Sequence, residues 1–88
     1  MTPDSVALWM LEKIRNESCI YQDDVVDFLV KNNQEVLLVE NADGNQVLGR
    51  NVLTSFRKLT DSTVVWVKPD RYWRFRVDED EPGRDARG

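Results

Sequence analysis

The chain has 88 residues, 41% of them hydrophobic, and its 12 Lys and Arg against 16 Asp and Glu give a net charge of −4. This is the size of one small domain, and no apolar stretch approaches the ~20 residues that span a bilayer. The chain contains one cysteine and no histidine, which excludes an internal disulfide, Cys/His zinc sites and nucleophiles activated by a histidine base. We therefore expect a cytoplasmic, non-catalytic protein with no cofactor and no metal site.

Basic and acidic residues are strongly segregated along the chain, which the net charge does not show. Residues 49–77 carry seven Lys and Arg against two Asp, whereas residues 1–48 carry three against nine and residues 78–88 carry two against five. Separated charges of this kind create local fields that steer charged partners even when the average is near zero. The pattern indicates a basic working surface in the third quarter of the chain.

The first predicted helix begins after Thr2, which is suited to the N-cap. Pro3 fits the first helical position, and Asp4 is favoured at the positive end of the helix dipole. Apolar residues then recur at helical spacing, namely Ala7, Met10, Leu11 and Ile14, with Val6, Leu8 and Trp9 broadening the apolar side. The helix should end near residues 16–18, and the apolar connector Cys19–Tyr21 should plug the core.

A second helix is predicted to open at residues 22–24 and to end at residues 32–33. Its acidic residues Asp23, Asp24 and Asp27 fit helix-start electrostatics and solvation rather than a metal site, which needs ligands from several segments. Residues 35–40 form an apolar run of strand length, followed by a dense turn signal over 41–45. Residues 46–48 are then expected to pair back as a brief strand.

The third predicted helix spans residues 49–60, and a two-stranded hairpin follows it. The helix should turn four apolar residues inward, namely Val52, Leu53, Phe56 and Leu59. Strands 64–67 and 72–77 flank the turn 68–71. A symmetric turn pairs Trp66 with Trp73 and Val64 with Phe75 on one face and leaves Val65, Tyr72, Arg74 and Arg76 on the other, whereas a three-residue loop shifts this register. Residues 1–77 thus form one domain, and residues 78–88 are expected to be an acidic disordered tail.

These elements predict an α+β, winged-helix-like fold with three helices, a short strand or hairpin before the third helix, and a C-terminal two-stranded hairpin. Five segments carry a resemblance to a known family: Trp9-Met10-Leu11, the Asn41…Gly44-Asn45 turn, FRKLT at 56–60, TVVW at 63–66 and RYWR at 71–74. Together they resemble the signature of a small uncharacterised bacterial family, of the kind also found among integron gene-cassette products. The resemblance covers nearly all of the chain except the tail. It implies a fold and a bacterial cytoplasmic origin, and no activity.

The first functional hypothesis is binding of double-stranded DNA. In winged helices that bind DNA, the third helix enters the major groove and the hairpin contacts the backbone or minor groove. The candidate contacts are Arg50, Asn51, Thr54, Arg57, Lys58, Lys68, Arg71 and Arg74. Arg and Asn suit base edges, and Lys suits phosphates. The alternative is an ordinary solvated face, which the acidic pI of about 4.7 favours.

The second hypothesis is association with another copy or another protein, without nucleic acid. Trp9, Val65, Val67 and Tyr72 are the candidate interface residues, because an outward apolar hairpin face forms a self-complementary patch. On this hypothesis the protein is a homodimer. The remaining hairpin aromatics, Trp66, Trp73 and Phe75, are expected in the core rather than in a base-stacking platform.

Overall fold

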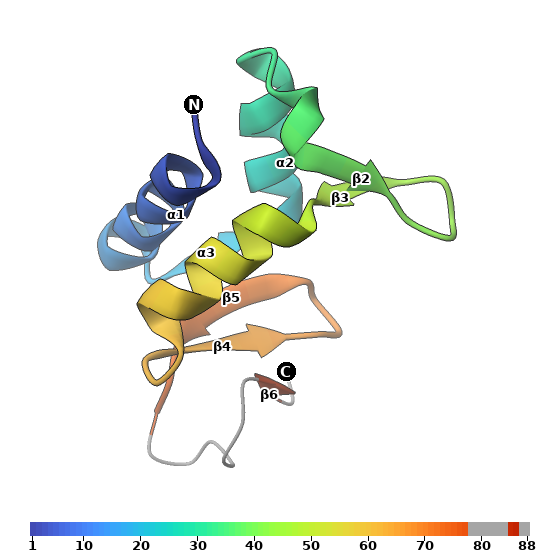
Figure 1. Cartoon of the computed structure of the whole chain (residues 1–88). Coiled ribbons are helices and arrows are strands. Elements are labelled where there is room, and N and C mark those ends of the chain that lie inside the picture. The colour runs from blue at the N-terminus through green and yellow to red at the C-terminus, as the bar shows by residue number, and fades with distance from the viewer. Residues whose placement is uncertain (78–84, 87–88) are drawn as a thin grey trace.

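Three helices and two small sheets make up the chain in the computed structural model, which describes residues 1–77 and 85–86 (Figure 1). In chain order the elements are α1 (Pro3–Glu17), β1 (Cys19–Tyr21), α2 (Gln22–Lys31), the 3-10 helix η1 (Glu35–Leu37), β2 (Leu38–Glu40), β3 (Gln46–Leu48), α3 (Arg50–Thr60), β4 (Val64–Val67), β5 (Tyr72–Phe75) and β6 (Asp85–Ala86). The predicted α+β, winged-helix-like layout is confirmed: three helices, a β2–β3 hairpin before α3, and a C-terminal β4–β5 hairpin.

Helix α1 begins where its capping residues predict. The Ser5 backbone N–H donates to Thr2 Oγ1 at 3.1 Å, and the Thr2 backbone N–H donates to Ser5 Oγ at 2.8 Å. This reciprocal pair is a capping box, and Pro3 follows it in the first turn. At the other end, Ser18 adopts a left-handed conformation with φ of 74° and its N–H donates to Ile14 O at 2.7 Å. The chain is thereby turned out of the helix and directly into β1.

The apolar connector Cys19–Tyr21, which was expected to plug the core, forms a strand. It pairs antiparallel with β5, with Ile20 opposite Trp73, and the larger sheet has the order β1-β5-β4-β6. Ile20 is buried, as expected for this segment. Three residues are too few to show strand periodicity in a sequence, so only the pairing with a segment more than fifty residues away defines β1.

The C-terminal hairpin has the predicted register. Trp66 faces Trp73 and Val64 faces Phe75 across a four-residue turn. Beyond it, residues 78–84 and 87–88 of the predicted tail lie outside the described residues. Asp85–Ala86 form the two-residue strand β6, which runs parallel to β4.

The core is built from all three helices, the larger sheet and Leu38 and Leu48 of the β2–β3 hairpin, with α3 crossing the β4–β5 hairpin in Figure 1. Phe56 of α3 meets Trp73 edge-on at 5.4 Å between ring centroids, and Trp66 lies 4.6 Å from Trp73. The predicted core position of Trp73 is confirmed. Trp66 is only half-buried against the core, and the prediction for Phe75 is wrong, because its side chain is exposed near the end of β5.

The inward side of α3 differs from the predicted stripe. Val52, Phe56 and Thr60 are buried, whereas Leu53 and Leu59 are 39% and 43% exposed. The buried positions recur every four residues, so Leu53 and Leu59 fall at the margins of the contact with α1 and the sheet. Thr60 is accommodated because its Oγ1 donates to Phe56 O at 2.7 Å. Leu8, which was expected to broaden the apolar side of α1, is also exposed.

The β2–β3 hairpin is shorter than the predicted strand run. Its first half forms η1, and pairing begins only at Leu38, which lies opposite Leu48. The turn matches its sequence signal, because Asn41 Oδ1 accepts hydrogen bonds from the Asp43 and Asn45 backbone N–H groups and Gly44 has φ of 81°. The hairpin projects away from the larger sheet in Figure 1.

Candidate functional site

The exposed side of α3 carries the predicted DNA-contacting residues of that helix on one surface. Arg50, Asn51, Thr54, Arg57 and Lys58 are all exposed. Their intervals of three, four and seven residues align them along one side of the helix, because these are the spacings of helical neighbours. Val52 and Phe56 anchor the opposite side in the core, so the rotation of α3 about its axis is set by packing.

Two carboxylates modify the charge of this surface. Arg57 Nε lies 3.6 Å from Asp61 Oδ1, and both side chains are about 70% exposed. A solvent-exposed ion pair of this kind contributes ~0–1 kcal/mol of stabilisation, so Arg57 can leave Asp61 to bind an anion that attracts it more strongly. The second carboxylate is Asp4, which lines a shallow hollow of about 310 Å³ between the start of α1 and α3, together with Asn51, Thr54 and Lys58.

The basic residues of the hairpin are placed differently from those of α3. Lys68 and Arg71 are exposed in the β4–β5 turn, where Arg71 has φ of 55° and its carbonyl accepts the Gln22 N–H at 3.0 Å. Because β1 runs beside β5 as far as Tyr72, this turn lies next to the start of α2 instead of extending as a long wing. Arg74 is half-buried within the sheet, and its Nη1 donates to the Phe75 carbonyl at 3.0 Å.

The predicted apolar interface on the hairpin is not an open surface. Val65 and Val67 lie on the face opposite Trp66 and Trp73, as the register required, but both are fully buried within the chain. The expectation that they are exposed is therefore wrong. Tyr72 on the same face is half-buried, and its ring centroid lies 5.1 Å from that of Tyr21.

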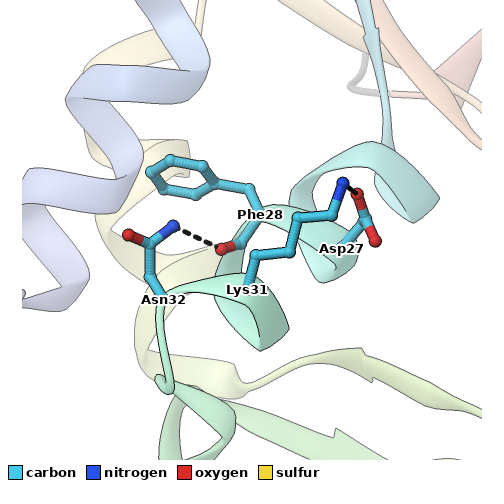
Figure 2. Close-up of polar contacts among 4 residues, drawn as sticks. All are labelled: Asp27, Phe28, Lys31 and Asn32. Atoms are coloured by element: carbon cyan, nitrogen blue, oxygen red, sulfur yellow. Dashed lines mark hydrogen bonds and ion pairs between the residues drawn. The ribbon is translucent and has the colours of Figure 1, made fainter.

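A second hollow is a groove between α1 and α2, and sequence reasoning did not identify it. Trp9 of α1 stacks on Phe28 of α2 with centroids 3.9 Å apart and ring planes 9° from parallel. Figure 2 shows Phe28 reaching from α2 towards α1, while the Asp27–Lys31 pair lies along α2. The groove has a volume of about 480 Å³ and is lined by Trp9, Lys13, Glu17, Cys19, Ile20, Tyr21, Asp24, Asp27, Phe28 and Lys31. In the sequence, the groove is indicated only by one aromatic residue on each of the two predicted helices, Trp9 and Phe28. These residues form a site only when the helices pack together.

The charges along this groove are mostly paired. Lys13 Nζ lies 3.5 Å from Glu17 Oε2 and 5.6 Å from the Trp9 ring centroid. Lys31 Nζ lies 2.8 Å from Asp27 Oδ2, and the hydrogen bond and charge of that carboxylate raise the pKa of Lys31 above its ordinary value. Asp24 makes no side-chain ion pair or hydrogen bond with the described residues.

Two further observations concern metals and membranes. Among the described residues, Cys, Asp and Glu side chains do not gather in groups of three or more that could hold a metal ion. Within the same residues, no helix combines the length and the apolar character needed to cross a membrane. Cys19 is a half-buried free thiol that lines the groove.

The fold and these surfaces are those of a small α+β protein whose described residues form two candidate binding faces. Comparison with protein families shows that the chain belongs to a family of unknown function, DUF6953, whose model matches residues 2–75. No curated protein and no solved structure matches the chain. The expected membership in an uncharacterised family is confirmed, while the bacterial and integron-cassette origin stays a prediction.

Proposed function

We propose that this protein is a non-catalytic DNA-binding protein that contacts duplex DNA through the exposed side of α3. The observation that supports the proposal is the aligned, exposed stripe from Arg50 to Lys58 on a helix whose other side is anchored in the core. Its residue types suit the task, because Arg and Asn can hydrogen-bond base edges in the major groove and Lys neutralises phosphates.

The hairpin turn has a secondary role in this proposal. Lys68 and Arg71 are exposed beside the start of α2 and contribute phosphate contacts, whereas Arg74 is held within the sheet. Base contacts are therefore assigned to α3 alone. Asp4 opposes binding, because its carboxylate shares the hollow with Lys58 and repels a nearby phosphate.

The proposal is tested by fluorescence anisotropy of a labelled random-sequence duplex across a salt series. Five cationic contacts predict that log affinity falls against log salt with a slope of about −4 to −5, and removing three of them reduces that slope by about 3. The test variant is Arg50→Ala/Arg57→Ala/Lys58→Ala. Its matched control, Lys13→Ala/Arg15→Ala/Lys31→Ala, removes the same charge from α1 and α2.

The proposal requires the two triple variants to differ. Loss of affinity and slope only in the α3 variant supports it, whereas equal losses in both variants mean that net charge alone governs binding. No binding by the unmodified protein at about 50 mM salt also overturns it, because phosphate contacts are strongest at low ionic strength. Asp4→Asn should act in the opposite direction and tighten binding about twofold.

A further inference from the structure

The α1–α2 groove is lined by the half-buried indole of Trp9. Phe28 covers one face of the Trp9 indole at 3.9 Å, and the ammonium of Lys13 lies over the ring at 5.6 Å from the centroid. A cation above an indole is attracted by the negative electrostatic potential of the ring face. The chain thus places its own positive charge beside an indole that lines the groove.

The charge lining the groove is not balanced. Lys13 and Lys31 are each paired with a carboxylate four residues away, Glu17 and Asp27 respectively. The third carboxylate, Asp24, lies in the first turn of α2 and has no such partner among the described residues. The groove that Trp9 lines therefore has a surplus of one negative charge, which complements a single cation.

We infer that this groove binds an arginine side chain presented by a partner protein. A guanidinium is planar, so it stacks on an indole and donates two parallel hydrogen bonds to one carboxylate, here Trp9 and Asp24. Tyr21, Asp24 and Asp27 are exposed on the walls, so the groove covers one side of its occupant. Small-molecule sites bury ~70–90% of their ligand, and a side chain lying across the surface fits this geometry better.

Lys13 has a defined part in this site. Its ammonium occupies the position over Trp9 that the guanidinium takes, and its flexible stem allows it to move towards Glu17 when displaced. Lys13 therefore competes with the ligand. Removing the charge of Lys13 should therefore strengthen binding of the ligand, whereas most substitutions of residues that line a binding groove weaken it.

The experiment is an NMR titration of the full chain, labelled with nitrogen-15, with the peptide acetyl-Gly-Arg-Gly-amide. The readout is the indole N–H signal of Trp9, assigned with a Trp9→Phe variant. The control peptide carries citrulline, which has nearly the same shape as arginine and no charge. We expect the arginine peptide to shift the Trp9 signal at millimolar concentration and the citrulline peptide to leave it unchanged.

Three single variants supply the decisive comparison. Asp24→Asn should weaken binding of the arginine peptide about threefold, and Lys13→Met should strengthen it about threefold. Asp23→Asn is the matched control, because this neighbouring acid on the same helix does not line the groove, and it should leave the affinity unchanged. The inference is overturned by equal shifts with the citrulline peptide, by no shift at Trp9, or by Lys13→Met failing to strengthen binding. Ethylguanidinium carries the same single charge as the peptide, and if it binds as tightly as the peptide the assignment to a protein side chain is overturned.

Discussion

The rings of Trp9 and Phe28 lie parallel, 3.9 Å apart, and join α1 to α2. The two residues are half-buried and pack against the core from its margin. Both residues also line the groove, so their contact joins the helices and shapes the candidate site.

A double-mutant cycle measures this stacking contact. Trp9→Leu and Phe28→Leu should each lower the free energy of unfolding, and together they should lower it by less than the sum, with a coupling of about 0.5–1.5 kcal/mol. Urea unfolding followed by circular dichroism gives the four values. Strict additivity would show that the two rings contribute independently.

Gly49 should not tolerate a side chain. A Cβ at this position would lie 2.7 Å from the Leu37 carbonyl oxygen, which is held there by the Gly49 N–H at 2.8 Å. Because the opposing atom belongs to the backbone, Gly49→Ala should cost about 1–3 kcal/mol. The control is Gly44→Asn in the hairpin turn, where asparagine tolerates the left-handed φ and the loss should stay below about 1 kcal/mol. Thermal unfolding distinguishes them, and equal losses would contradict the close approach at Gly49.

The capping box of α1 should make a measurable contribution to stability. Thr2→Ala removes the acceptor for the Ser5 N–H and should lower the free energy of unfolding by about 1 kcal/mol. Thr2→Ser keeps a hydroxyl in the same place and should retain most of that stability. Chemical unfolding in guanidinium chloride separates the two variants. If alanine and serine behave alike, the N-terminal cap is frayed in solution.

The Asp27–Lys31 pair should be visible as a titration shift. The hydrogen bond and charge of Asp27 raise the pKa of Lys31, so its ammonium persists to higher pH in the folded chain than in the unfolded chain. The stabilisation is therefore complete below the ordinary lysine pKa of 10.5 and is lost as pH rises through the higher folded value. NMR titration of the Lys31 Nζ should give a raised pKa, and Asp27→Asn should return it towards the ordinary value. Indistinguishable titrations in the two proteins would show that the pair does not form.

Short-range features of the fold were predictable from residues that are neighbours in sequence. Thr2 and Ser5 form the predicted start of α1, Asn41 and Gly44 form the predicted turn, and the four-residue connection sets Trp66 opposite Trp73. In each case the interacting groups lie within a few residues of one another. Local hydrogen bonding and conformational preference are then sufficient to specify the structure.

The same distinction between short-range and long-range interactions applies to the predictions for the candidate sites. Exposure of the polar stripe on α3 followed from helical periodicity, which applies to any helix with one buried side. The prediction that Val65 and Val67 are exposed was wrong. Hairpin register determines which face of the sheet a side chain occupies, but it does not determine whether other elements cover that face. The α1–α2 groove was missed because Trp9 and Phe28 are nineteen positions apart and share no periodic signal.

The sequence by itself thus determined the helix starts, the turns, the strand pairing of the C-terminal hairpin and the polar side of α3. Tertiary structure alone decided that Cys19–Tyr21 is a strand, that Leu53 and Leu59 lie at the edge of the core, and that two aromatic residues form a groove. The physical reason is the range of the interactions. Caps, turns and helical periodicity depend on groups within one or two turns of chain, whereas burial and groove formation depend on which distant surfaces pack together.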